Sequence, residues 1–153
     1  VPAFSGLGAP YWDSGAKAVI CGITRTTGRA EVVKAALDSI VYQITDIVRA
    51  MQEASGIEIG ELRVDGGPTR NAYLMQFQSD MLGIPVRIPE AEELSGIGAA
   101  YAAGLSLGIY DEKIFDKMGR TSYKNELDKE QCEGLYAGWK DAVRMVMTRS
   151  DTP

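Results

Sequence analysis

The chain has 153 residues, of which 45% are hydrophobic and 24% are charged, with a net charge of −5 and no histidine. This length and balance suit about one globular domain, and they argue against a disordered chain, nucleic-acid binding and contact with an anionic membrane surface. No run of about 18 apolar residues predicts a membrane span, and without histidine the chain cannot form Ser-His-Asp or Cys-His catalytic groups or histidine zinc sites.

The opening residues 1–15 combine glycine and proline with three aromatic side chains. This mixture predicts an ordered loop that is anchored by its aromatic residues. The same aromatics, together with Asp13, could instead contact a small polar ligand. The apolar run over 18–24 predicts a short strand, in which Gly22 would let another backbone come close.

The clearest predicted element is a long helix over 29–55, because apolar residues recur there at three- and four-residue steps. Glu31 suits the positive end of the helix dipole, and Gly56 is placed to end the helix. We therefore expect a core helix whose buried face consists of Val33, Leu37, Ile40, Val41, Ile44, Ile47, Val48 and Met51.

A short strand is predicted over 61–65, before two glycines. A second helix is then expected from Pro68, where a missing amide hydrogen costs nothing, to near Gly83. Residues 84–89 predict another strand, whose prolines favour the edge of a sheet or the first position of a strand.

The remainder of the chain alternates again between helix and irregular structure. A helix is predicted over 93–107, and its many small residues call for close approach to a sheet or another helix. Residues 110–128 are polar and turn-rich, which indicates a surface excursion, and an amphipathic helix follows over about 129–147. The whole order predicts an α/β fold with a mixed sheet, some parallel pairing and flanking helices.

The sharpest local motif is the Asp-Gly-Gly turn at residues 65–67. Gly66 and Gly67 would let the backbone approach a ligand, and the helix start behind them would attract a phosphate or a nucleotide edge. Asn71, expected one turn into the helix, would present its amide to the same place. The alternative is a tight turn in which Asp65 caps nearby amides. The motif is neither a Walker loop nor a GxGxxG fingerprint.

Other reactive side chains give weaker signals. Cys21 and Cys132 are far apart in sequence and form no CxxC pair, so free thiols are the preferred interpretation, with one disulfide as the alternative. Arg25 and Arg29 bracket a helix start and could face a phosphate, although surface solvation is the simpler reading. The acids within 90–93 form no carboxylate pair with catalytic spacing and are expected to be solvated.

Taken together, the motifs of the chain resemble the carboxy-terminal half of the FGGY family of carbohydrate kinases, in family order and over nearly all of its length. The Gly-Ala-Pro-Tyr-Trp sequence within the first motif is most similar to the glycerol kinases of that family. The segments that carry the resemblance are 4–13, 22–25, 36–40, 42–43, 62–67, 71, 74–80, 98–105 and 136–140.

The resemblance implies an actin-like, ribonuclease-H-like ATPase fold, of which residues 1–153 would be a single carboxy-terminal segment in the second lobe. Such enzymes transfer the γ-phosphoryl group of ATP, with Mg²⁺, to glycerol or a related polyol or ketose. By motif, Gly67 and Asn71 would contact the adenosine part of ATP or ADP, and Gly66 would shape the turn.

The resemblance also implies what this segment does not carry. The family's catalytic aspartate, its main phosphate-binding turns and its polyol pocket belong upstream, so we expect no catalytic residue and no metal ligand here. We expect the segment alone to be inactive and the intact enzyme to be a cytoplasmic homo-oligomer. Two alternatives remain: a sister kinase acting on xylulose or ribulose, and a non-catalytic regulatory or interaction module on the same fold.

Overall fold

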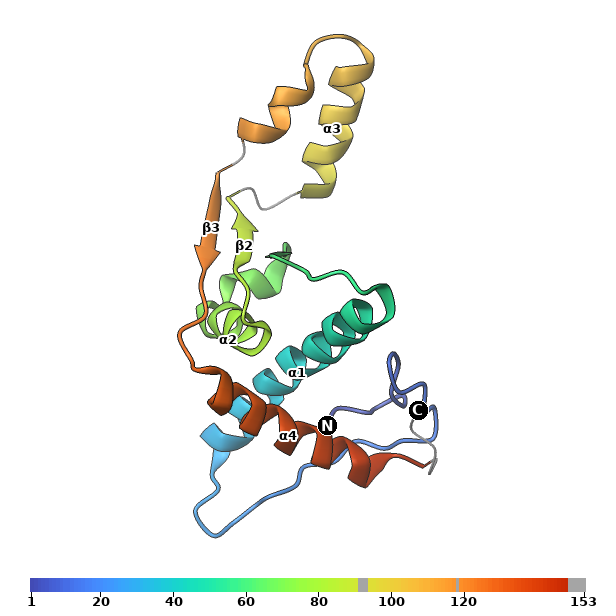
Figure 1. Cartoon of the computed structure of the whole chain (residues 1–153), viewed down its shortest axis with the longest axis vertical. Helices are drawn as coiled ribbons and strands as arrows, with labels where there is room; N and C mark the ends of the chain where they lie inside the picture. Colours follow the sequence, from blue (N-terminus) through green and yellow to red (C-terminus); the bar gives the residue numbers. More distant parts are fainter. Residues whose placement is uncertain (91–93, 118, 149–153) are drawn as a thin grey trace.

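The structure is a computed structural model, and it describes residues 1–90, 94–117 and 119–148 (Figure 1). Its elements in chain order are α1 (Arg29–Ser55), β1 (Leu62–Arg63), the 3-10 turn η1 (Gly67–Arg70), α2 (Ala72–Leu82), β2 (Val86–Pro89), α3 (Leu94–Ser106), the 3-10 segment η2 (Glu112–Lys117), β3 (Arg120–Tyr123) and α4 (Lys129–Val146). Within these described parts, no helix is long and apolar enough to cross a membrane.

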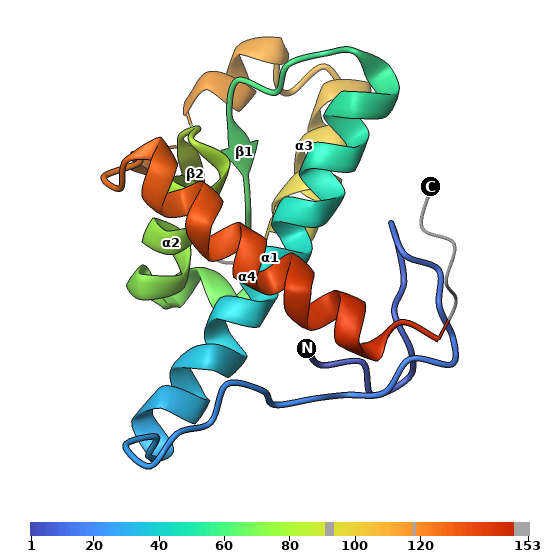
Figure 2. The same ribbon diagram turned by 60° about the horizontal axis from the view of Figure 1, so that its bottom comes forward.

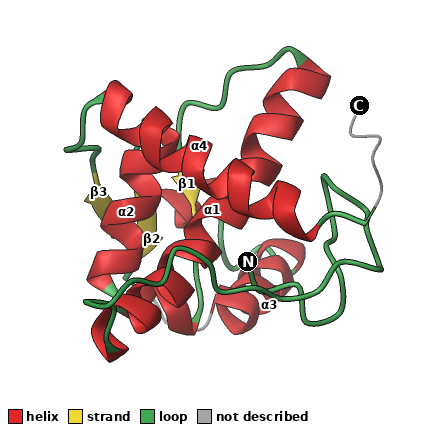
Figure 3. Ribbon diagram, turned by 90° about the horizontal axis from the view of Figure 1, so that it is seen from below, coloured by secondary structure: helices red, strands yellow, loops and turns green. Residues whose placement is uncertain are grey.

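The three described strands form one small mixed sheet in the order β1-β2-β3. Leu62 of β1 lies opposite Val86 of β2 in a parallel pair, and Val86 lies opposite Tyr123 of β3 in an antiparallel pair. Helix α2 packs against this sheet, and α1 and α4 pack against α2 (Figure 3). The predicted α/β class with a mixed sheet and flanking helices is therefore confirmed.

The order of the sheet corrects two details of the prediction. β2 is the central strand, so the predicted sheet edge is wrong, whereas the predicted entry position fits Pro85, which directly precedes the strand; Pro89 closes it. The expected surface excursion over 110–128 contains η2 and the strand β3. The short run that forms β3 is polar, and it becomes a strand because β2 offers it a hydrogen-bonding partner.

Helix α1 has the predicted bounds and end signals. The Glu31 carboxylate accepts a hydrogen bond from the Gly28 N–H at 2.8 Å, and Gly56 ends the helix in the left-handed conformation at φ 66. The buried face differs from the prediction. Val41 and Val48 are buried as expected, whereas several other members of the apolar face are exposed: Val33, Ile40, Ile47 and Met51.

The buried side of α1 instead carries four polar residues, Asp38, Ser39, Thr45 and Asp46. Two clusters of buried apolar residues lie against the helix. The first joins α1, α2, β2 and α4 and consists of Val41, Leu74, Met75, Phe77, Met81, Val86 and Cys132. The second joins the amino-terminal loop to α4 and consists of Ala3, Leu7, Ala16, Trp139 and Val143.

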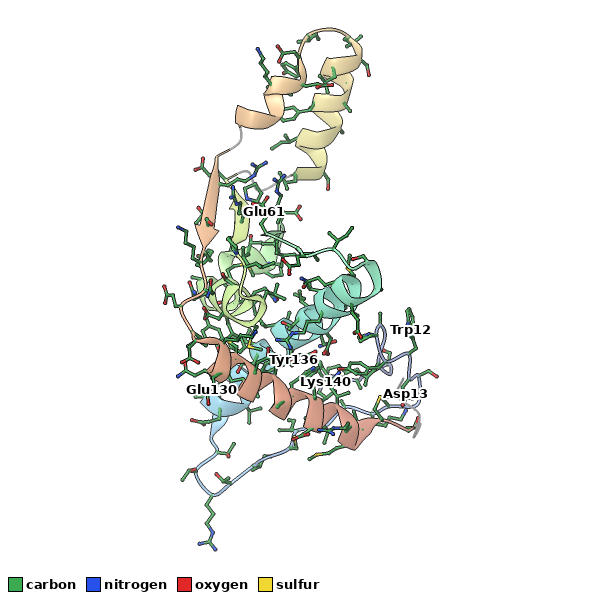
Figure 4. All side chains as sticks on the ribbon, in the orientation of Figure 1. Trp12, Asp13, Glu61, Glu130, Tyr136 and Lys140 are labelled. Carbon is green, nitrogen blue, oxygen red and sulfur yellow. The ribbon has the colours of Figure 1, made fainter. Side chains whose placement is uncertain are left out.

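A buried carboxylate ties these segments together. Asp46 on α1 is only 2% exposed, and it accepts hydrogen bonds from the Tyr11 hydroxyl at 2.8 Å, the Tyr136 hydroxyl at 2.5 Å and the Trp139 Nε1 at 2.7 Å. Burial, and then the bond to Asp46, raises the pKa of both tyrosines. Lys140 on α4 donates to the Tyr11 hydroxyl at 3.0 Å; Tyr136 and Lys140 lie close together on α4 (Figure 4).

A second buried carboxylate, Asp13, closes the amino-terminal loop onto the end of α4. It accepts hydrogen bonds from the Thr148 N–H at 2.6 Å and the Thr148 hydroxyl at 2.7 Å, and from the Gly15 N–H at 2.9 Å. These bonds, chiefly those from Thr148, lower the pKa of Asp13 to about 2. The prediction of an anchored loop is thus confirmed for Tyr11, while Trp12 remains 71% exposed.

The predicted strand over 18–24 is wrong: these residues form no strand, and only Val19 pairs with the backbone of Val1. Figure 2 shows this segment running as an extended loop past α1 and α4. Gly22 adopts φ 75, and no other backbone lies within 4 Å of the position that a Cβ would take. A glycine at position 22 is therefore explained by the left-handed backbone conformation and not by the close approach of another backbone.

Helix α3 projects away from α4 together with η2 (Figure 1). The close approach to a sheet or another helix that was predicted for this small-residue helix is not found at its glycines. At Gly104 the position of a Cβ would meet the ring of Tyr110, which lies in the loop after the helix. At Gly96 and Gly98 no atom of the described residues lies within 4 Å of that position. At the glycines, the small residues therefore make room for one aromatic ring near the end of α3.

We expect Asp46→Ala to lower the free energy of unfolding by about 3 kcal/mol, since a buried donor left without its acceptor costs about 1–3 kcal/mol and Asp46 serves three donors. Urea denaturation followed by circular dichroism measures this change. Asp46→Asn should fall between the wild type and Asp46→Ala, because an amide keeps one acceptor oxygen.

Asp141→Ala is the matched control, since Asp141 lies on α4 and forms an exposed ion pair with Arg144. Loss of an exposed pair should change the free energy by less than about 1 kcal/mol. Equal unfolding midpoints for Asp46→Ala and Asp141→Ala would contradict a structural role for Asp46.

Candidate functional site

The Asp-Gly-Gly motif forms an open turn at the end of β1. The parallel pairing continues one residue past the strand, where the Val64 N–H donates to the Arg87 carbonyl at 3.1 Å. Gly66 then adopts φ 91 and ψ 180, a conformation that strongly favours glycine. The strand therefore turns away from the sheet at Gly66, which places the following residues at the carboxyl end of β1.

The turn is held by its own backbone and by Thr69. The Thr69 hydroxyl donates to the Gly66 carbonyl at 2.7 Å, and the Thr69 N–H donates to the same oxygen at 3.1 Å. The Asn71 N–H closes the 3-10 turn by donating to the Pro68 carbonyl at 3.1 Å. Asp65 is exposed. The sequence predicted a turn here but attributed its capping to Asp65, whereas Thr69 supplies the side-chain bond.

The sequence predicted Asn71 one turn inside the second helix, but Asn71 lies directly before α2. Its backbone is extended, and its side-chain oxygen accepts a hydrogen bond from the Leu74 N–H at 3.2 Å, so Asn71 caps the helix. The difference arises because Pro68 begins a 3-10 turn that ends before α2 begins. The cap uses the carboxamide oxygen, so a ligand contact would fall to the NH₂ group.

The three residues that the sequence singled out, Gly66, Gly67 and Asn71, are thus brought together within one turn. Both glycines are exposed, and nothing lies within 4 Å of the position that a Cβ would take at either of them. A flat group can therefore approach the backbone of both glycines. The amino end of α2 adds a partial positive charge beside this opening.

A polar cluster joins α1 to α2 next to the turn. The Tyr73 hydroxyl donates to Asp38 at 2.5 Å, and Lys34 contacts the other oxygen of Asp38 at 2.6 Å. Burial alone would lower the pKa of Lys34, but the hydrogen bonds and charge interactions with Asp38 and Tyr73 together outweigh it and raise that pKa. Sequence reasoning missed this cluster, because Asp38 and Tyr73 are 35 positions apart and no local pattern links them.

The remaining candidates are not brought to this turn by any contact described here. Tyr11 and Asp13 are engaged in the bonds of the amino-terminal loop. Arg25 is exposed, and both cysteines are free, as the preferred interpretation held. Glu90 is exposed, while Glu92 and Glu93 lie outside the described residues. Within the described ranges, no group of three or more Cys, Asp or Glu side chains could hold a metal ion.

The chain is similar to proteins of known type over most of its length. It is 49% identical to the glycerol kinase of Symbiobacterium thermophilum over 146 residues, which cover 94% of the chain and 29% of that relative. It is 34% identical to the structure of Plasmodium falciparum glycerol kinase with ADP, with a TM-score of 0.89 over 97% of the chain and 30% of that protein. The chain thus spans less than a third of the length of these relatives.

A more distant structure supports the fold alone. The xylulose kinase of Rhodospirillum rubrum is 22% identical, with a TM-score of 0.74 over 95% of the chain and 30% of that protein. Residues 1–107 match the C-terminal domain of the FGGY family of carbohydrate kinases, and this range contains the turn at Gly66 and its supports on α1 and α2. The chain therefore belongs to the FGGY family of carbohydrate kinases.

Proposed function

We propose that the chain is the nucleotide-binding, carboxy-terminal part of an ATP-dependent glycerol kinase. The observation that carries this proposal is the open turn of Gly66, Gly67 and Asn71 in a chain that is 49% identical to a glycerol kinase. The similar Plasmodium falciparum glycerol kinase was solved with ADP, which supports a nucleotide at this type of domain.

In the proposed reaction, a hydroxyl oxygen of glycerol attacks the γ-phosphorus of ATP. The bond from that phosphorus to the bridging oxygen breaks, ADP leaves, and the hydroxyl proton passes to a base outside this chain. The part played by this chain is binding and orientation, which supply much of the rate in phosphoryl transfer. Gly66 and Gly67 would admit the adenosine face, and the NH₂ group of Asn71 would donate to it.

We propose that Mg²⁺ takes part in the reaction as an ion bound to the phosphates of ATP. Mg²⁺ in kinases is held by substrate phosphates with one or two carboxylates, and it neutralises charge on the transferred group. The described residues contain no cluster that could bind the ion by itself. We therefore assign no metal ligand to this chain.

We further propose that residues 1–153 are a single segment of one carboxy-terminal kinase domain. The family match ends at residue 107, but α4 lies beyond it and supplies Cys132, Trp139 and Val143 to the two cores. The proposed enzyme would work in the cytoplasm as a homo-oligomer.

The function is tested by restoring the missing part of the enzyme. The amino-terminal portion of the Symbiobacterium thermophilum relative, up to the start of the match, is fused ahead of Val1. We expect this fusion protein to release ADP from ATP in the presence of glycerol, and the chain alone to show no turnover. Xylulose and ribulose serve as competing acceptors in the same coupled assay.

A folded fusion protein that turns over no acceptor would contradict the kinase proposal and favour the non-catalytic module. Turnover of glycerol by the 153 residues alone, at the rate of the fusion protein, would contradict the expected division between the two parts. Thermal unfolding of the fusion protein shows whether it is folded.

The role of Asn71 is tested in the same fusion protein. Asn71→Ala should raise the KM for ATP about fivefold, because one hydrogen bond is worth about 1 kcal/mol, while the KM for glycerol stays nearly unchanged. Asn71→Asp keeps an oxygen that can cap α2 but lacks the NH₂ donor, so it should raise the KM for ATP with little loss of stability.

Asp128→Ala is the matched control, since Asp128 caps α4 by accepting from the Gln131 N–H at 2.8 Å. It should lower stability by about 1 kcal/mol, as loss of a cap does, and leave the KM for ATP unchanged. An unchanged KM for ATP in both Asn71 variants would remove Asn71 from the site.

A further inference from the structure

A large apolar groove lies on the opposite side of α1 from the buried Val41. The groove has a volume of about 780 Å³ and is formed by the amino-terminal segment, the first half of α1 and the middle of α4. Phe4, Ile20, Val32, Ile40 and Leu135 line it, and all five are exposed. An exposed apolar surface of this kind marks a site that another molecule or segment covers.

The polar groups in the groove do not suit a polar ligand. Asp38 is the one charged residue among the described residues that line it, and its carboxylate already binds Lys34 and Tyr73. Ser39, also in the lining, donates its hydroxyl to the Ala36 carbonyl of its own helix at 2.7 Å. Pockets for small molecules place a few polar groups to orient the ligand. Here Asp38 and Ser39 are bonded inside the protein and most of the lining is apolar, so an apolar occupant fits the groove best.

The apolar surface also continues beyond the groove. Val32, Ile40, Ile47 and Met51 are exposed and lie on one face of α1, at successive steps of eight, seven and four residues. This strip runs from Val32 to Met51, about 29 Å at 1.5 Å per residue, which is longer than a small molecule can cover. A folded polypeptide surface is the occupant that fits both the length and the chemistry.

We propose that the amino-terminal portion of the kinase polypeptide packs into this groove and covers the exposed face of α1. This inference rests on the proposed function, because it takes the occupant from the part of the relatives that the chain does not match. The chain covers only 29–30% of those relatives, so most of their length is available to form this contact. The groove is then an internal interface of the intact enzyme.

The two cysteines allow a test that does not depend on catalysis. Cys21 lines the groove and is exposed, whereas Cys132 is buried in the first core cluster. Labelling with N-ethylmaleimide, read for each peptide by mass spectrometry, should modify Cys21 rapidly in the chain alone. In the fusion protein we expect the labelling rate of Cys21 to fall at least tenfold. Slow labelling of Cys132 in both proteins reports that each is folded.

A cysteine outside the groove serves as the control for general loss of access. Asp141→Cys, at an exposed position of α4, should label at the same rate in the chain and in the fusion protein. Unchanged labelling of Cys21 in a fusion protein that protects Cys132 would overturn the proposal. Protection of Cys21 that grows with the concentration of the chain alone would overturn it too, because the occupant would then be a second copy.

Two isoleucines provide a matched pair of variants. Ile40 lines the groove and is 43% exposed, whereas Ile57 follows the end of α1, lies outside the groove and is 67% exposed. In the fusion protein, Ile40→Glu should restore rapid labelling of Cys21, because a charge is costly to bury, and Ile57→Glu should not. Equal labelling in the two variants would contradict the groove as the interface.

Labelling and turnover separate this inference from the proposed function. Protection of Cys21 in a fusion protein without kinase activity would leave the interface standing and contradict the proposed function. Kinase activity in a fusion protein whose Cys21 is still fully reactive would support the proposed function and contradict the interface.

Discussion

The arrangement of the chain depends on the buried carboxylate of Asp46. A charge in the interior is tolerable only if it is fully hydrogen-bonded, and Asp46 meets this condition with Tyr11, Tyr136 and Trp139. These three donors come from two segments at opposite ends of the sequence. The amino-terminal loop and α4 must therefore both lie against α1, since moving either away would leave donors and acceptor unpaired in the interior.

The position of α1 also fixes the candidate site, because α1 is hydrogen-bonded to α2, which begins beside that site. Asp38 on α1 binds Tyr73, which lies two residues after Asn71, so the start of α2 is held by the helix that Asp46 fixes. The opening beside Gly66 and Gly67 is thus bordered by a turn and a helix start that hydrogen bonds hold in place. The same frame leaves one face of α1 uncovered, which is why the groove exists at all.

Sequence reasoning succeeded where local signals decide the outcome. The bounds of α1 follow from Glu31 and Gly56, and the turn at Gly66 follows from a conformation that favours glycine. Sequence reasoning failed where the structure of a segment depends on contacts with residues that are distant in sequence. β3 forms because β2 pairs with it, and the exposed face of α1 has the same apolar pattern as a buried face. The cap at Asn71 was misplaced because a 3-10 turn and an α-helix start with the same residues.

The central claim is that the turn from Gly66 to Asn71 forms one wall of a nucleotide site. Photo-crosslinking of the fusion protein with an azidoadenine derivative of ATP tests it most directly, with the labelled peptide located by mass spectrometry. We expect, for this segment, an adduct within residues 64–73 that excess ATP suppresses. Adducts confined to other parts of the segment, or an adduct in this stretch that excess ATP does not suppress, would contradict it.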